Sequence, residues 1–169
     1  DLHLSIRRQR QMCIRDSIEV LSDEIKEVTF HLDGLGADST GPGNSYYLED
    51  THHYLNTPSE IRTTNTLDNI YDGSYTFDLI KMDTQGSELD IIKGGKFLIN
   101  KAKGIILEEN VYRYNFGAAL HSEIKEYMES IGFVLAELLD EKNRNITNRE
   151  GNVVKQREID TLYIRKELI

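Results

Sequence analysis

The sequence has few of the residues that define specialised classes of protein. Its 169 residues include one cysteine (Cys13), two prolines and no tryptophan. A single cysteine excludes an intramolecular disulfide framework and a cysteine-rich zinc site. No apolar run approaches the ~18 residues of a membrane-spanning helix. Residues 1–17 lack the apolar core of a secretory leader, so we expect a soluble, cytoplasmic protein that does not bind membranes.

The rest of the composition is that of one folded domain with an acidic surface. Hydrophobic residues make up 38% of the chain and charged residues 29%, which excludes a disordered chain. The length is about that of one domain. The net charge of −9 opposes non-specific binding to nucleic acid or to anionic lipid, so we expect neither as a partner.

Residues 1–17 differ from the rest of the chain because they carry four arginines against two aspartates. Such a basic segment is typical of an arm for an acidic partner or of an amphipathic targeting segment. Its string RQRQMCIRDS also resembles the translated read-through of a sequencing adapter, which is the interpretation we favour. We therefore predict a non-native or disordered leader over 1–17 and a single domain over 18–169.

Apolar periodicity predicts strands that alternate with helices. The expected strands are 18–21, 27–32, 61–67, 77–82, 104–107, 133–139 and 159–165. The expected helices are a turn from residue 68, a helix from residue 87 that Gly94-Gly95 interrupts, and an amphipathic helix over 119–131. This order favours an α/β fold with a mostly parallel sheet covered on both faces. A polar loop over 140–157 would join the last two strands, which predicts an antiparallel ending.

The segment 78–88 is the most informative for chemistry, because Asp83 ends a strand, Gly86 permits a tight turn and Glu88 begins a helix. Ligands of open α/β sheets bind at the carboxyl ends of strands. Two carboxylates there can position a hydroxyl group, accept its proton or hold a metal ion. In the alternative interpretation, Asp83 caps the turn and Glu88 complements the helix dipole. The spacing leaves both open.

The four histidines at positions 31, 52, 53 and 121 are the remaining candidates for metal ligands. Two adjacent histidines in a strand point to opposite faces, and no H-x-x-x-H spacing accompanies them. We therefore predict no metal site.

Several motifs in order resemble the FkbM-type methyltransferase family. The string DLIKMDTQGSELDIIKGG (78–95) is similar to the family's strand, Asp, Gly-containing turn and Glu before a helix. Further similar segments are VLSDEIKEVTFHL (20–32), the Gly-Asn-Ser loop (43–47), the threonine-rich strand (63–68) and GIILEEN (104–110). The resemblance covers roughly residues 18–167.

The resemblance implies a Rossmann-like class I methyltransferase fold, of which this chain is the carboxyl-terminal part with an antiparallel final strand. It implies S-adenosylmethionine as cofactor and O-methylation of a hydroxyl on a carbohydrate or other small-molecule acceptor. It assigns Asp83 and Glu88 to catalysis, Asp83 and Gln85 to the cofactor, and Asn44, Tyr46, Glu108 and Asn110 to the acceptor. Glu108 and Asn110 have a structural alternative, in which they only close their strand.

One departure from the family pattern concerns the cofactor. Gly34-Leu-Gly36 follows a strand but precedes no helix, so it does not have the context of a cofactor loop. A ribose-binding acid about 20 residues later is also missing. We therefore expect weak cofactor binding by a truncated domain, and self-association through an exposed edge at 77–82. The alternative function is a non-catalytic α/β module that binds a carbohydrate or a protein.

Overall fold

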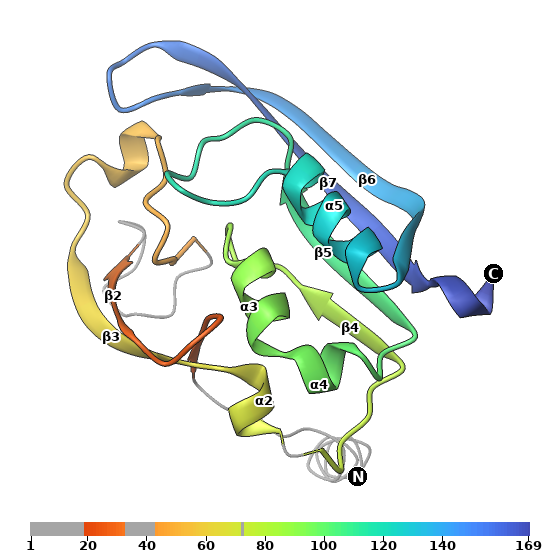
Figure 1. The fold of residues 1–169 in the computed structure, drawn as a ribbon. Coiled ribbons are helices and arrows are strands. Elements are labelled where there is room, and N and C mark those ends of the chain that lie inside the picture. Colours follow the sequence, from red (N-terminus) through yellow and green to blue (C-terminus); the bar gives the residue numbers. More distant parts are fainter. Residues whose placement is uncertain (1–18, 33–42, 72) are drawn as a thin grey trace, which may run out of the picture.

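The computed structural model describes residues 19–32, 43–71 and 73–169 (Figure 1). The predicted leader and the Gly34–Gly36 turn lie outside these residues, so both interpretations stay predictions. Among the described helices, none has the length and apolar character needed to cross a membrane.

The strands among the described residues form two sheets. The smaller sheet has the order β1-β3-β2, with β3 parallel to β1 and antiparallel to β2. Its strands are β1 (Val20–Leu21), β2 (Glu27–His31) and β3 (Ser59–Asn65). Thr64 is buried in β3, where its hydroxyl donates to the Glu24 carbonyl oxygen and accepts from the Lys26 amide. These contacts tie β3 to the turn between β1 and β2.

The larger sheet is mixed and has the order β4-β5-β7-β6. Its strands are β4 (Leu79–Met82), β5 (Gly104–Asn110), β6 (Phe133–Thr147) and β7 (Val153–Arg165). Only β4 and β5 are parallel, and β7 runs antiparallel to both β5 and β6. The expectation of a mostly parallel sheet is therefore wrong, whereas the antiparallel ending is confirmed. The reason is that β6 joins β7 by a hairpin, which forces the two strands to be antiparallel.

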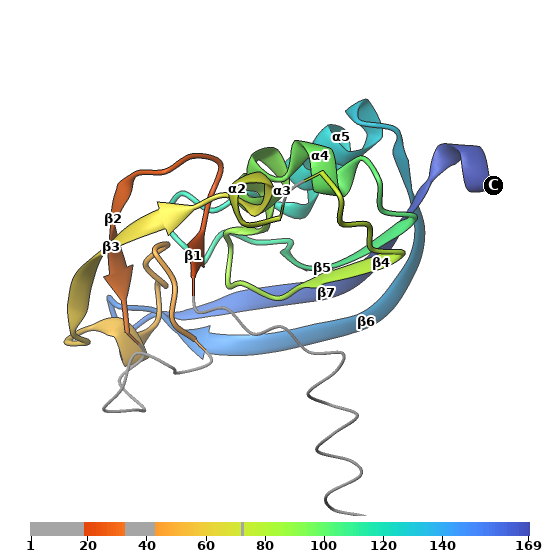
Figure 2. The same cartoon turned by 90° about the horizontal axis from the view of Figure 1, so that it is seen from below.

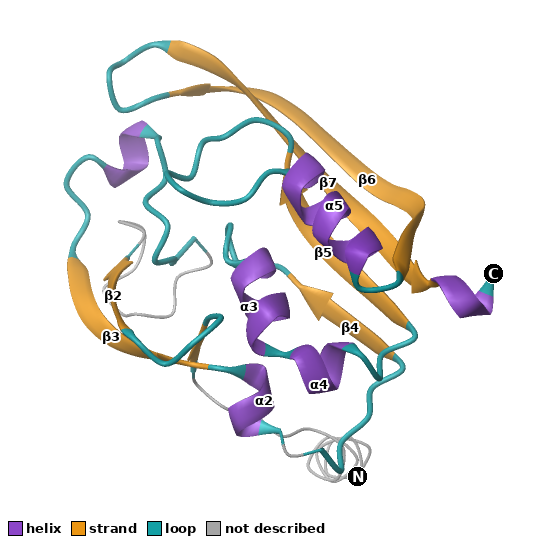
Figure 3. Ribbon diagram, viewed as in Figure 1, coloured by secondary structure: helices purple, strands orange, loops and turns teal. Residues whose placement is uncertain are grey.

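Helices cover one face of the larger sheet, as Figures 2 and 3 show for α3, α4 and α5. The described helices are α2 (Leu67–Ile70), α3 (Glu88–Gly94), α4 (Lys96–Ile99) and α5 (His121–Ser130), with short 3₁₀ turns η1 (His52–Tyr54) and η2 (Lys166–Leu168). The core lies between these helices and the sheet, and its least exposed side chains include Ile92, Ile99, Ile105, Leu107, Met128 and Tyr163. Helices on both faces, which the sequence predicts, are not found in the described residues.

A close backbone contact explains why the helical segment after residue 87 is divided. α3 ends at Gly94 and α4 begins at Lys96, which confirms the expected interruption. A Cβ atom added to Gly94 would lie 2.1 Å from the carbonyl oxygen of Ser22. Glycine therefore lets α3 approach the turn that follows β1.

The long hairpin of β6 and β7 replaces the predicted polar loop over 140–157. β5 pairs with β7 only as far as Glu158, so β6 and β7 continue alone as a two-stranded ribbon. Two β-bulges, at 135–137 and 138–140, interrupt the register of β6. We call residues 140–158 the arm. The polar side chains of the arm do not prevent strand formation, because most are exposed and the buried Gln156 and Glu158 have Arg144 as a partner.

Candidate functional site: a polar cavity between the strand ends and the arm

The parallel register of β4 and β5 brings two carboxylates to one edge of the sheet. Met82 pairs with Leu107, so Asp83 and Glu108 are the next residues on neighbouring strands. Asp83 follows β4, as predicted. Glu108 lies inside β5 and does not close it, because the strand continues to Asn110.

Gln85 connects these two carboxylates. Its side-chain nitrogen donates to Asp83 Oδ1 and to Glu108 Oε2, each at 3.2 Å. Its backbone φ is 53°, in the left-handed region, where a non-glycine residue costs ~1–3 kcal/mol. Its carbonyl oxygen accepts hydrogen bonds from Ser45 Oγ at 3.0 Å and Asn115 Nδ2 at 3.3 Å. These two contacts hold Gln85 in the conformation that aims its amide at both carboxylates.

The arm supplies the opposite wall, which carries both signs of charge. Lys142 Nζ lies 2.7 Å from Glu108 Oε1, and Arg144 Nη2 lies 2.8 Å from Glu158 Oε2. Arg144 Nε also donates to Gln156 Oε1 at 2.7 Å. Each cation of this wall is therefore matched by a carboxylate with little exposure, 11% for the Glu108 side chain and 5% for Glu158.

Together these residues enclose a cavity of about 470 Å³ whose lining side chains are all polar: Asp83, Gln85, Glu108, Lys142, Arg144 and Glu158. A second cavity of about 410 Å³ shares Gln85, Arg144 and Glu158 and extends toward Glu49 and Tyr114. The lining contains donors and acceptors in alternation, which is the arrangement that binds hydroxyl groups.

The pKa values of the two carboxylates move in opposite directions. Burial alone would raise the pKa of Asp83, but the interaction with the Glu108 carboxyl, the hydrogen bond from Gln85 and the charge of Lys81 hold it below its usual value. Burial raises the pKa of Glu108; Lys142 opposes this shift and Asp83 adds to it. At neutral pH Asp83 is therefore ionised and able to accept a hydrogen bond.

Glu88 lies away from the cavity, inside the turn between β4 and α3. Its Oε1 accepts hydrogen bonds from the Thr84 amide at 2.7 Å and the Thr84 hydroxyl at 3.0 Å. The residue is 2% exposed, and this burial raises the pKa of Glu88 to about 7. The structure therefore does not bring Glu88 together with Asp83 at the cavity wall, and its contacts are those of a residue that holds the turn.

The comparison with protein families decides to which family the chain belongs. The model of the methyltransferase FkbM domain matches residues 7–135. The chain belongs to the FkbM methyltransferase family. The resemblance noted from the sequence motifs is thereby confirmed. No curated protein and no solved structure matches the chain.

The family match divides the cavity of this FkbM domain into two parts. Asp83, Gln85 and Glu108 lie inside the matched range, whereas the arm lies beyond its end at residue 135. The arm residues were not predicted, because 140–157 was interpreted as a loop. The local signal for a hairpin here is the Asn148–Asn152 turn, in which Gly151 has a φ of 85°.

The other residues predicted for the acceptor do not line either cavity. The Tyr46 hydroxyl donates to Asp90 Oδ2 on α3 at 3.0 Å. Asn110 is buried in β5 opposite Glu158, and Asn44 precedes Ser45, which is the residue of that loop that contacts Gln85. Their roles at an acceptor stay predictions.

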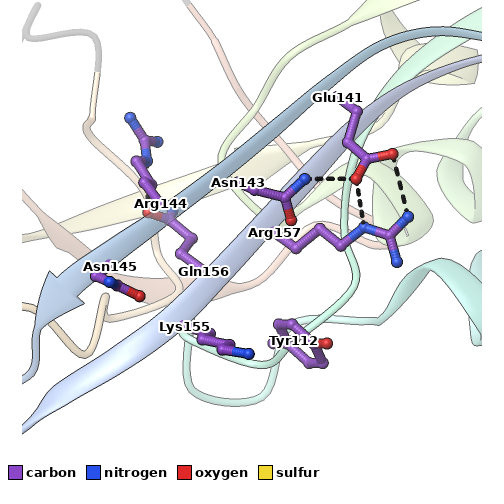
Figure 4. A pocket seen from close by; sticks show the side chains of 8 residues that line it. All are labelled: Tyr112, Glu141, Asn143, Arg144, Asn145, Lys155, Gln156 and Arg157. Carbon is purple, nitrogen blue, oxygen red and sulfur yellow. Dashed lines mark hydrogen bonds and ion pairs between the residues drawn. The ribbon is translucent and has the colours of Figure 1, made fainter.

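The outer face of the arm carries a different set of side chains (Figure 4). A pocket of about 390 Å³ there is lined by Tyr112 and by residues of both arm strands: Glu141, Asn143, Arg144, Asn145, Lys155, Gln156 and Arg157. Glu141 forms two contacts with Arg157, at 3.0 and 3.1 Å, whereas Lys155 has no ion pair with any described residue. Figure 4 shows the Lys155 side chain extending toward Tyr112 and Arg144 extending away from both. Arg144 lines both this pocket and the cavity, but only the cavity contains Asp83.

Proposed function

We propose that this FkbM domain acts in S-adenosylmethionine-dependent O-methylation, with a sugar or another small hydroxylated metabolite as acceptor. One observation carries the proposal: an ionised Asp83 at the end of β4 faces a cavity lined only by polar side chains. Its size, about 470 Å³, is in the usual range for small-molecule sites.

In this proposal Asp83 accepts a hydrogen bond from the acceptor hydroxyl and takes its proton when the oxygen is alkylated. Its lowered pKa makes Asp83 a weak base, so orientation of the hydroxyl is its larger contribution. Orientation supplies ~7–11 kcal/mol in well-aligned reactions, whereas a general base adds ~10²–10⁴-fold. Gln85, Lys142 and Arg144 would contact the other hydroxyl groups of the acceptor.

The described residues do not complete a site for S-adenosylmethionine. A groove of about 470 Å³ runs along the unpaired edge of β4, with apolar lining residues that include Leu67, Tyr71, Phe77 and Leu79. Asp83 is the single carboxylate among the described residues that line this groove. The described residues of the groove supply neither a second acid for the ribose hydroxyls nor a row of backbone donors for the methionyl group.

The experiment is methyl transfer from methyl-labelled S-adenosylmethionine to a panel of methyl hexosides, with the full chain. We expect Asp83→Asn to lower transfer by ~10²–10⁴-fold, the range for loss of a general base. The matched control is Asp78→Asn, because Asp78 is exposed before β4 and pairs with Lys103 at 2.7 Å, away from the cavity. Equal effects of both substitutions would contradict the role of Asp83.

The incomplete cofactor groove is the observation that favours the alternative, a non-catalytic module that binds a carbohydrate. The two functions differ in whether the wild-type chain transfers a methyl group. Saturable binding of a hexoside that Asp83→Asn weakens, with no transfer by the wild-type chain at millimolar S-adenosylmethionine, would support the module and reject the transferase.

A further inference from the structure

A continuous line of polar contacts runs from the arm to Asp83. Lys142 Nζ contacts Glu108 Oε1 at 2.7 Å, Glu108 Oε2 accepts from Gln85 at 3.2 Å, and Gln85 donates to Asp83 Oδ1 at 3.2 Å. Lys81 ends the line, with its Nζ 3.5 Å from Asp83 Oδ2. These contacts join β6, β5 and β4, so a change at Lys142 reaches Asp83 through two intermediate side chains.

The position of Lys142 depends on the fold of β6. Lys142 pairs with Glu158 in the register, on the face of the sheet that also carries Glu108 and Asn110. The Lys142 side chain is 47% exposed and the Glu108 side chain 11%. The lysine therefore covers a carboxylate that is otherwise turned into the cavity.

We propose that Lys142 is a positioning residue, which acts on Asp83 through Glu108 and Gln85. Neither the family match, which ends at residue 135, nor the sequence motifs assign it a role. With Lys142 in place, Glu108 offers Oε1 to the lysine and keeps Oε2 as an acceptor for the Gln85 amide. Gln85 is thereby fixed between the two carboxylates and sets the orientation of Asp83.

Loss of Lys142 has a direct electrostatic consequence for Glu108. The charged groups that face Glu108 are Asp83 after β4, Lys142 and Arg144 on β6, and Glu158 and Asp160 on β7. Arg144 is engaged by Glu158, so Lys142 is the cation that stabilises the ionised form of Glu108. Without it Glu108 takes up a proton at higher pH, and a protonated carboxyl competes with Gln85 for Asp83.

The proposal rests on the proposed function only in taking Asp83 as the reacting group. The test is therefore a titration, which needs neither acceptor nor cofactor. The carboxyl carbons of the full chain are followed by NMR from about pH 3 to pH 9, together with the side-chain amide signals of Gln85. The variants are Lys142→Gln, Lys142→Arg and, as the matched control on the outer face of the same arm, Lys155→Gln.

We expect Lys142→Gln to move the Glu108 titration midpoint upward by about 1 unit, the low end for removal of an opposite charge in contact. The Gln85 amide signals should move with it. Lys142→Arg should restore both readouts, and Lys155→Gln should change neither.

Three outcomes would overturn the proposal: an unchanged Glu108 midpoint in Lys142→Gln, a shifted midpoint with unchanged Gln85 amide signals, or an equal shift in Lys155→Gln. A fall in melting temperature without a change in the Glu108 titration would likewise reduce Lys142 to a structural role. Methyl transfer is measured separately, so an inactive chain with the expected titration would reject the transferase and leave the positioning role intact.

Discussion

At the scale of single residues, the turn between β4 and α3 depends on a carboxylate that is almost completely buried. Glu88 accepts two hydrogen bonds from Thr84, and its pKa is raised to about 7 by burial. A folded-state pKa above the ordinary value of 4.5 means that the folded chain binds a proton more tightly than the unfolded chain. The associated stability is complete below about pH 4.5 and is lost as the pH rises through about 7.

This linkage predicts how Glu88→Gln changes the pH dependence of unfolding. The amide stays neutral and keeps an oxygen for the Thr84 amide, so the loss of stability between about pH 5 and pH 8 should disappear. The wild-type chain should lose about 3 kcal/mol over that range relative to the variant. Urea unfolding at several pH values measures this pH dependence of the free energy of unfolding. The control is Glu126→Gln, on the exposed face of α5. Parallel curves for wild type and Glu88→Gln would show that the carboxylate is solvated.

At the scale of elements, the packing of α3 against the turn after β1 requires a residue without a side chain. The carbonyl oxygen of Ser22 occupies the place of a Cβ atom at Gly94. Alanine is ordinarily better than glycine in a helix by ~1 kcal/mol. Here the close contact with backbone outweighs that preference.

We therefore expect Gly94→Ala to lower the free energy of unfolding by about 1–3 kcal/mol, the range for overpacking. Chemical denaturation measures the difference. Gly73→Ala is the control, because Gly73 is exposed and the nearest atom to its added Cβ, Lys101 Nζ, is 4.0 Å away. A more stable Gly94→Ala variant would mean that α3 can move away from the turn without loss.

The elements that the sequence predicts well are those with one buried face. Strands near 27–32, 61–67, 77–82 and 104–107 and the helix near 119–131 are confirmed within a few residues. Apolar side chains at a regular spacing mark them, and those of β4, β5 and α5 pack in the core. The arm has no such apolar period, since polar side chains dominate on both of its faces, and its strand pairing is seen only in the register of the hairpin.

The same distinction applies to the candidate site. Asp83 was found because a strand end followed by a glycine turn is a local pattern, and Gln85 was assigned through the family resemblance. Lys142, Arg144 and Glu158 were missed because they reach the cavity through pairing of distant strands. The spacing of Glu88 left a site role and a structural role open, and the family resemblance placed it beside Asp83, but the turn folds its carboxylate back onto Thr84. Local patterns therefore locate one wall of the cavity, and tertiary pairing supplies the other.

At the scale of the whole molecule, the two edges of the larger sheet differ in character. β6 forms one edge and carries charged side chains that include Glu137, Asp140 and Glu141. β4 forms the other, where Leu79 is 55% exposed beside the apolar groove. Unpaired apolar edges are templates for pairing with another chain, whereas charged edges resist it. We propose that two copies of the chain associate through β4.

This proposal predicts that Leu79→Lys reduces self-association, because each added charge would lie against the partner's edge. Leu138→Lys is the control, since Leu138 is 50% exposed on the edge that is already charged. Sedimentation velocity over a range of concentrations compares both variants with the wild-type chain. Association that survives Leu79→Lys, or that Leu138→Lys abolishes equally, would place the contact elsewhere.

The two β-bulges of β6 also determine which changes in chain length the arm tolerates. Side chains alternate between faces along a strand, so an inserted or deleted residue within 141–147 would turn part of β6 over and exchange its inner and outer side chains. At a bulge, the strand already carries one residue without a partner, and Ala136 and Leu139 occupy these positions. Deletion of either residue leaves the pairing of Lys142 with Glu158 intact. Natural variation in the length of this hairpin is therefore expected to concentrate at these two positions and at the tip.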